Sequence, residues 1–592
     1  MGLKSKASFE KKHAEHTAGE REIYGADPGA IEFSAGSPGF LALLICSALA
    51  VVLVLYYLIY IKVFVTMPAD ILMWAETNFV GDLIKLRTGS PIYTAPGDNN
   101  SLIYTPGAPI LTYAISWIIG KSTSIAAWRS IQLGYIFCAA LVATMCVRRL
   151  SDLAAPDIRI PFSRTWSAFC FLALFLAATA PNINKFAHCL HTDALALLVS
   201  ICSFWTMIFY LKAPSVKRLL LMAICPAIGY FVKEFLIAWS AVMFIFLFLD
   251  NPGNVKRLIL FTSAATLFIL AVAGGCYLMW GDNYLFWTFK VMGGARKQIG
   301  ISPAACNISL ARSLDHTIRA WMEIAIGLVG GALALREENL RRLGPLWASW
   351  IVLIGLEAFS SGAGWGVLYH FGPGVLIGMV WTLSALSKIW PWTQPKQGAI
   401  PALNKWFKPV GAVAFVLTIF VALHVIPNAD ANEARNWKQR PTPNIYSYLQ
   451  EIEREFDGFP PEKVLLDIGN WVYLRSSTLA KDRAISLADQ PCNSIFENFD
   501  VMISRIRNKT YDKILVHDFH SPFFIYDYSL WHKSSGVRKA LLENYTEIRT
   551  INLTGSQGVS TPMIMFLGPV SVLVPKSEAP NNENNVAGEK QH

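Results

Sequence analysis

Residues 66–120 read TMPADILMWAETNFVGDLIKLRTGSPIYTAPGDNNSLIYTPGAPILTYAISWIIG and follow a long apolar run. Asp70 and Glu76 begin a series of acidic residues at roughly helical spacing. Pro106 introduces a final apolar stretch of about 14 residues, which is too short to cross a bilayer comfortably and is typical of a re-entrant or interfacial helix. We therefore interpret residues 67–124 as a loop that forms one wall of an active site facing the membrane surface.

The composition indicates a polytopic α-helical membrane protein. Of the 592 residues, 53% are hydrophobic and 16% are charged, which is too apolar for a soluble chain of this length. The net charge of +10 comes from Lys and Arg in short loops between apolar runs, where anionic lipid and membrane topology account for them. We therefore expect a lipid bilayer, and no nucleic acid, as a partner.

The apolar runs predict about 11 transmembrane helices. Their ranges are 39–66, 125–147, 165–181, 194–211, 217–232, 235–249, 258–280, 317–335, 345–360, 370–387 and 408–426. Lys and Arg gather in the loops on one side of these helices, and the positive-inside rule places those loops in the cytoplasm. This orientation requires residues 107–120 not to cross. It puts the 67–124 loop and the C-terminal region on the extracytoplasmic side, which we expect to be that of a bacterial inner (plasma) membrane.

We divide the chain into four parts. These are a flexible cytoplasmic tail (1–38), a transmembrane catalytic module (39–426), an extracytoplasmic domain (427–576) and a disordered tail (577–592). The third part alternates strand and helix patterns, which predicts a small α/β domain. The predicted strands are 464–468, 513–517, 563–566 and 570–574, and the predicted helices are 494–507 and 535–545.

Asp70 and Glu76 lie near the mouth of the first predicted helix, where a carboxylate is costly unless it is solvated or used. Their spacing places them about 120° apart on a helix, so that both can line one broad wall. The alternative is an interfacial helix whose acidic side chains simply face water.

Two further candidate sites lie at predicted helix ends. His191 and Asp193 can contact a divalent ion or an anionic head group, although Asp193 is equally suited to cap the next helix. Lys233 and Glu234 interrupt an apolar stretch. They either form an ion pair at a tight turn or offer the lysine ammonium group to a phosphate.

Two loops supply the remaining candidates. Residues 281–316 combine aromatic side chains with Arg296 and Lys297, a pattern that suits either an interfacial belt or phosphate contact. Tyr369 and His370 belong to a glycine-rich stretch that forms either a close-packed turn or the lip of a binding site.

The motifs DILMWAE (70–76), LRTGSPIY (86–93) and YTP (104–106) together resemble the first external loop of the GT-C class of membrane glycosyltransferases. The resemblance is closest to the branch that includes the aminoarabinose transferases and protein O-mannosyltransferases. It implies a GT-C fold with a juxtamembrane helix in the external loop, extending to about residue 426. It also implies transfer of a monosaccharide from a polyprenyl-phosphate donor to a lipid, glycan or protein acceptor at the outer membrane face.

The resemblance also implies roles for individual residues. Asp70 matches the catalytic position and would act as general base with Glu76 beside it, in a single displacement that inverts the anomeric carbon. Lys233, followed by Arg296 and Lys297, would bind the donor phosphate. The substrate-binding candidates are Tyr104, His191, Asp193, Tyr369 and His370.

Two positions depart from the family pattern. Ile71 stands where a second acid is common, and Thr105 stands where a lysine is common. The Asp-x-Asp metal motif of oligosaccharyltransferases is absent, so we expect no required cofactor, while His188 and His191 leave a divalent cation open. The alternative function is a transporter or flippase for a lipid-linked or anionic solute.

Overall fold

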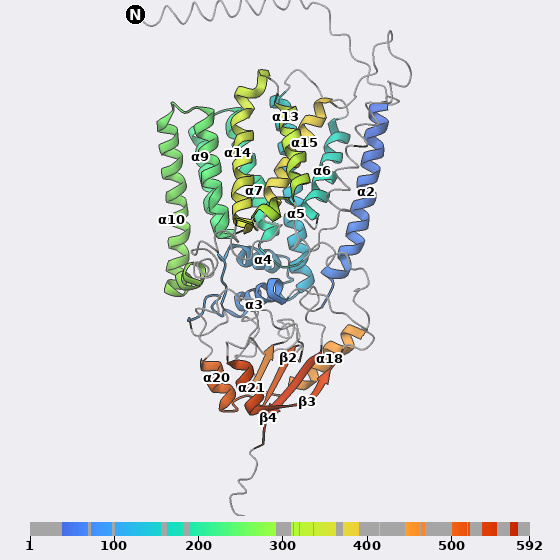
Figure 1. Ribbon diagram of the computed structural model, residues 1–592, viewed down its shortest axis with the longest axis vertical. Helices are drawn as coiled ribbons and strands as arrows, with labels where there is room; N and C mark the ends of the chain where they lie inside the picture. Colours follow the sequence, from blue (N-terminus) through green and yellow to red (C-terminus); the bar gives the residue numbers. More distant parts are fainter. Residues whose placement is uncertain are drawn as a thin grey trace, which may run out of the picture.

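The computed structural model places a bundle of helices above a small sheet (Figure 1). The residues that it describes are 38–68, 73–96, 101–154, 163–180, 189–291, 310–311, 313–318, 320–335, 337–362, 371–389, 414, 444–460, 463–467, 500–517, 519–520, 536–552 and 569–577. The predicted terminal tails lie outside these residues, except for Pro38 and Ser577.

Five helices of the described part are long and apolar enough to cross a membrane. They are α2 (Pro38–Val65), α5 (Ile125–Ala154), α7 (Asp193–Lys212), α10 (Val255–Leu285) and α14 (Glu337–Gly362). The shorter helices of the bundle are α6 (Ser163–Thr179), α8 (Val216–Val232), η1 (Glu234–Ala238), α9 (Trp239–Asp250), α13 (Trp321–Ala334) and α15 (Gly372–Ile389). A helix occurs at each predicted span except 408–426, which lies outside the described residues apart from Ala414.

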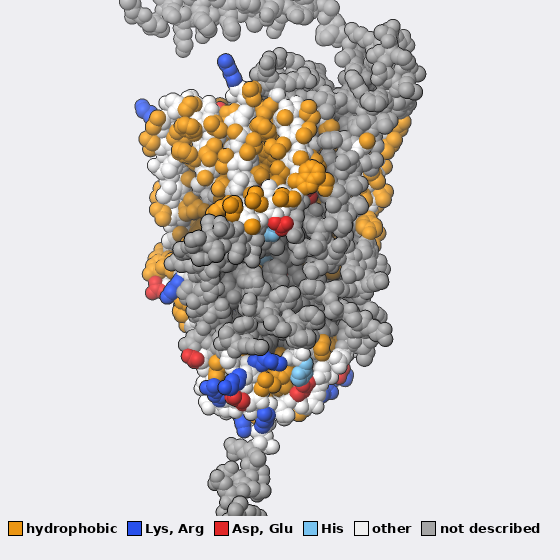
Figure 2. Space-filling model, in the orientation of Figure 1, with side chains coloured by type: hydrophobic (Ala, Val, Ile, Leu, Met, Phe, Trp, Pro, Cys, Tyr) orange, Lys and Arg blue, Asp and Glu red, His pale blue; other side chains and the backbone are white. Residues whose placement is uncertain are grey.

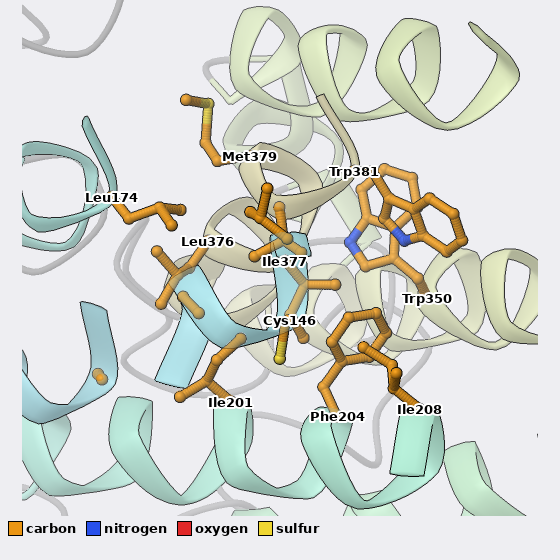
Figure 3. Packing of buried hydrophobic residues seen from close by; sticks show 14 of the residues in the cluster. Cys146, Leu174, Ile201, Phe204, Ile208, Trp350, Leu376, Ile377, Met379 and Trp381 are labelled. Atoms are coloured by element: carbon orange, nitrogen blue, oxygen red, sulfur yellow. The ribbon is translucent and has the colours of Figure 1, made fainter. Parts of the chain in front are cut away.

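The centre of the bundle is a continuous apolar core. Trp350 of α14 and Trp381 of α15 pack near Phe204 of α7, as Figure 3 shows. α13 and α15 pack closely at Gly327 and Gly378. A Cβ atom added at Gly327 would lie 2.8 Å from the Cα atom of Gly378, so this contact requires glycine. Small residues permit such close approach between membrane helices, where packing rather than water exclusion drives association.

The outer surface matches a bilayer environment. Hydrophobic side chains dominate the coloured part of the bundle, whereas many of the charged side chains in view lie around the sheet (Figure 2). Leu278 and Met279 of α10 are exposed by 86% and 71%. Apolar side chains exposed in this way on helices of spanning length face lipid, so the protein is a membrane protein.

The predicted external loop contains two helices that lie between the bundle and the sheet (Figure 1). These are α3 (Met73–Thr88) and α4 (Gly107–Ile118). α4 has 12 residues and is shorter than a membrane-spanning helix. Gly89 has a φ of +71°, a conformation that favours glycine, and it allows the chain to turn as α3 ends.

The C-terminal region contains a four-stranded sheet with the order β1-β2-β4-β3. β1 (Val464–Asp467) is parallel to β2 (Lys513–His517), whereas β4 (Val570–Pro575) is antiparallel to both β2 and β3 (Tyr545–Ile551). The accompanying helices are α18 (Asn444–Phe456), α20 (Asp500–Arg507) and α21 (Val537–Asn544).

This sheet differs in two ways from the sequence-based expectation. α18 was not predicted, and neither was the edge strand β3, which begins at Tyr545 directly after α21. The predicted strand 563–566 lies outside the described residues. One buried apolar cluster contains Phe79 of α3, Leu449 of α18 and Val572 of β4, so α3 is packed together with the sheet region.

Candidate functional site

The break predicted at Lys233 separates α8 from η1. Lys233 has extended backbone angles (φ −158°, ψ 123°), and its N–H donates to the carbonyl of Gly229 at 2.8 Å. The turn needs glycine at position 229 because an added Cβ atom would lie 2.8 Å from the Cβ atom of Leu236. Lys233 therefore lies at a turn whose backbone geometry is fixed.

Lys233 pairs with Asp193, the first residue of α7. Lys233 Nζ lies 2.6 Å from Asp193 Oδ1, and His191 Nδ1 lies 2.8 Å from Asp193 Oδ2. The side chains of Lys233 and Asp193 are 12% and 13% exposed, while that of His191 is 3% exposed. We call these three residues the Asp193 triad. Its ion pair is mostly removed from water but remains partly accessible.

Aromatic rings connect this triad to the external loop. Phe79 of α3 stacks on Tyr104 with ring centroids 5.9 Å apart. The His191 ring presents an edge-on contact to both, at 5.4 Å from Phe79 and 6.2 Å from Tyr104. Tyr93 donates a hydrogen bond to the Tyr104 carbonyl at 2.6 Å, which fixes the backbone there.

Glu76 lies in α3, where its side chain is fully buried. Arg129 of α5 binds it through two parallel hydrogen bonds, from Nε to Oε1 and from Nη2 to Oε2, each of 2.8 Å. The Leu190 N–H also donates to Oε1 at 3.0 Å. Glu76 was predicted as a second acid beside Asp70. Because both of its carboxylate oxygens bind Arg129, this geometry suits a positioning role better than proton transfer.

Arg129 was not among the residues that the sequence singled out. Its Nη1 also donates to the carbonyls of Phe64, at 3.0 Å, and Met67, at 2.6 Å. A signal was nevertheless present, because Arg129 is the single charged residue between Lys121 and Arg148. A lone charge within an apolar helix is expected to be paired and to have a function.

α4 begins directly against the end of α8. A Cβ atom at Gly107 would lie 2.4 Å from the carbonyl oxygen of Phe231, so the contact requires glycine. Thr105, the residue that stands in place of the family lysine, is fully buried. It contributes no positive charge, and within the described part of the chain the cation that pairs with Asp193 is Lys233.

Five of the predicted site residues lie in one connected neighbourhood: Glu76, Tyr104, His191, Asp193 and Lys233. The other predicted site residues lie outside the described residues: Asp70, Arg296, Lys297, Tyr369 and His370. Among the side chains that the structure describes, no group of three or more His, Cys, Asp or Glu is arranged to hold a metal ion.

The chain is similar in fold to a solved GT-C glycosyltransferase. ArnT from Cupriavidus metallidurans, bound to undecaprenyl phosphate, matches with a TM-score of 0.54 at 12% identity, covering 91% of this chain and 99% of that one. The archaeal oligosaccharyltransferase AglB from Archaeoglobus fulgidus, in complex with an inhibitory peptide and a dolichol-phosphate, gives a TM-score of 0.45 at 10% identity. That match covers 91% of this chain and 76% of AglB.

No protein-family model and no curated protein matches the sequence. The likeness to ArnT, an aminoarabinose transferase, therefore concerns the fold. It confirms the GT-C fold that the sequence resemblance implied, and it extends over nearly the whole of both chains.

Proposed function

We propose that this protein is a glycosyltransferase that moves a monosaccharide from a polyprenyl-phosphate donor to a lipid, glycan or protein acceptor at the outer membrane face. The observation that carries the proposal is the partly accessible Lys233–Asp193 pair, held at a helix break beside the external loop. A GT-C fold shared with a protein that binds undecaprenyl phosphate supports the lipid-phosphate donor.

In the proposed reaction, Asp70 removes the proton of an acceptor hydroxyl as the hydroxyl oxygen attacks the anomeric carbon. The bond between that carbon and the phosphate oxygen breaks in the same step, and the electron pair stays on the lipid phosphate. This single displacement inverts the anomeric configuration. The products are the glycosylated acceptor and the free polyprenyl phosphate, with the proton on Asp70.

Lys233 stabilises the negative charge that develops on the departing phosphate. A fixed cation at this point acts in a site with little water, where electrostatic stabilisation of the transition state is strongest. Asp193 and His191 orient the lysine, because Asp193 pairs with Lys233 Nζ at 2.6 Å and with His191 Nδ1 at 2.8 Å. Tyr104 offers an aromatic surface beside them for the sugar.

The test is a transfer assay on purified protein in lipid. It offers radiolabelled polyprenyl-phosphate monosaccharides and a membrane extract as acceptor. Asp70→Asn should lower turnover by about 10²- to 10⁴-fold, the usual contribution of a general base. Lys233→Gln should lower it by about 10²- to 10³-fold. Lys217→Gln is the matched control, because Lys217 lies exposed at the other end of α8 and should retain wild-type turnover.

Label that moves to a new product with wild type and Lys217→Gln, but not with Asp70→Asn, supports the proposal. If no donor is used while labelled lipid is moved across the bilayer, the protein is instead a transporter or flippase.

A further inference from the structure

Arg129 makes an unusually complete set of contacts for a buried residue. Its guanidinium group binds both carboxylate oxygens of Glu76 and the carbonyl oxygens of Phe64 and Met67. Four N–H bonds are therefore directed at four separate oxygens. The planar five-donor fork of arginine makes this possible, and a lysine ammonium with three donors cannot reproduce it.

These contacts bind residues that lie on either side of Asp70 in the sequence. Met67 precedes Asp70 in the sequence, and Glu76 follows it. One side chain of α5 thus binds the chain on both sides of Asp70. A single guanidinium group therefore joins the end of α2 to the start of α3.

The same ion pair reaches the other side of the site. Glu76 Oε1 accepts the Leu190 N–H at 3.0 Å, and Leu190 directly precedes His191. His191 and Lys233 in turn bind Asp193. An uninterrupted series of contacts therefore connects Met67 through Arg129 and Glu76 to the Asp193 triad. We call Arg129, Glu76 and the three backbone groups that they bind the Arg129 clamp.

Stability alone does not explain a completely buried ion pair. Both side chains are completely buried, and the cost of removing two charges from water is comparable to the attraction between them. Apolar residues of similar volume often stabilise a protein as well as a buried ion pair does. Apolar contacts are not directional, so they do not fix the distances between three separate backbone segments.

We propose that the Arg129 clamp sets the register between the chain at Met67 and Glu76, which flank Asp70 in the sequence, and the Asp193 triad, so that Arg129 and Glu76 are positioning residues for transfer. The catalytic part of this inference rests on the proposed function. Its physical part, the coupling of two chain segments, does not. Small displacements of reacting groups are enough to cost about 10²-fold in rate.

The test compares Arg129→Lys with wild type by two independent measurements. Hydrogen exchange followed by mass spectrometry reports on residues 60–68 and 189–195. Arg129→Lys should raise amide exchange in both segments by about tenfold, because it removes the bonds to the Phe64 and Met67 carbonyls and frees the Glu76 carboxylate that accepts the Leu190 N–H. Exchange in β2 should stay unchanged. Steady-state transfer should show kcat reduced by about 10²-fold, with KM for the donor within about threefold of wild type.

Arg149→Lys is the matched control. Arg149 lies on the same helix but forms an exposed pair with Asp152 at 4.0 Å, so neither measurement should change. Glu76→Gln is the second variant, since it keeps the shape of the side chain while weakening the bonds to Arg129. It should raise exchange in residues 189–195 in the same way.

Exchange that rises only in residues 60–68 would overturn the coupling. An unchanged kcat in a folded Arg129→Lys protein would overturn the positioning role. If the wild type transfers no sugar while both segments still respond together, the coupling is supported and the proposed function fails.

Discussion

Lys233 Nζ lies 2.6 Å from Asp193 Oδ1, across 40 positions of sequence. One residue lies at the break after α8 and the other begins α7, so neither helix alone places the pair. The ammonium group is oriented by the Asp193 carboxylate. In the proposed reaction it needs little reorganisation when negative charge develops on the donor phosphate.

Variants of the Lys233–Asp193 pair should change the stability of the protein and its turnover independently. Lys233→Met or Asp193→Asn alone should each destabilise the protein by about 3 kcal/mol, because each leaves a mostly buried polar partner uncompensated. The double variant should recover much of that loss, because neither charge is then left unpaired. Turnover should stay low in all three. Thermal unfolding and the transfer assay measure the two effects.

An exposed pair provides the comparison for these variants. Lys539 and Glu543 are 76% and 49% exposed and lie 3.8 Å apart, so Lys539→Met should change the unfolding temperature very little. A double variant that is as unstable as the sum of the two single changes would argue against direct coupling between Lys233 and Asp193.

A larger residue at the start of α4 should clash with the end of α8. Gly107→Ala would place a methyl group 2.4 Å from the Phe231 carbonyl oxygen, and backbone atoms must move to accept it. We expect a loss of about 1–3 kcal/mol in stability, as for other overpacked sites. Turnover should also fall, because Phe231 is two residues from Lys233.

Gly134→Ala on α5 is the matched control for this change. An added Cβ atom at Gly134 meets no atom within 4 Å, so alanine should be neutral or slightly stabilising there. Equal unfolding temperatures for the two alanine variants would contradict the close contact between α4 and α8.

The sequence predicted much of the bundle because hydropathy determines which segments enter a bilayer. It also indicated the Lys233 break, since a Lys-Glu pair in an apolar run is costly without a purpose. The pairing of Lys233 with Asp193, and of Glu76 with Arg129, was not predictable. Both pairs join distant segments whose contact depends on how the helices pack.

The sheet region shows another reason for a failed prediction. β3 follows α21 directly at Tyr545, with no glycine or proline between the two elements. Without such a residue, the change from a helical to an alternating pattern is difficult to locate. α18 did carry a signal, because Tyr448, Leu449 and Ile452 lie on one buried face of it.

Glu357 of α14 binds the start of α15 through the backbone of Gly374. Its two carboxylate oxygens accept the Gly374 N–H at 3.0 and 3.2 Å, while Trp350 Nε1 donates to the Gly374 carbonyl at 2.7 Å. Glu357→Leu should cost about 1–3 kcal/mol in stability because it leaves this N–H without its acceptor. Glu357→Gln keeps an acceptor oxygen and should cost much less. Equal unfolding temperatures for the two variants would show that the bond contributes little.

The orientation expected from the basic loops can be tested at Asn508. This residue is exposed after α20 and begins an Asn-Lys-Thr sequence, which receives a glycan only if it reaches the lumen of the endoplasmic reticulum. Synthesis in microsomes should add a glycan that endoglycosidase H removes. Asn508→Gln, made in a chain whose other acceptor asparagines are already glutamine, should abolish it.

The opposite end of the bundle supplies the reciprocal measurement. Lys256→Thr creates an Asn-x-Thr sequence at Asn254, in the turn between α9 and α10. The positive-inside rule places this turn in the cytoplasm, so it should stay unmodified while Asn508 is glycosylated. A glycan at Asn254 and none at Asn508 would reverse the orientation. The sheet and the Lys233 site would then face the cytoplasm, and transfer at the outer face would be excluded.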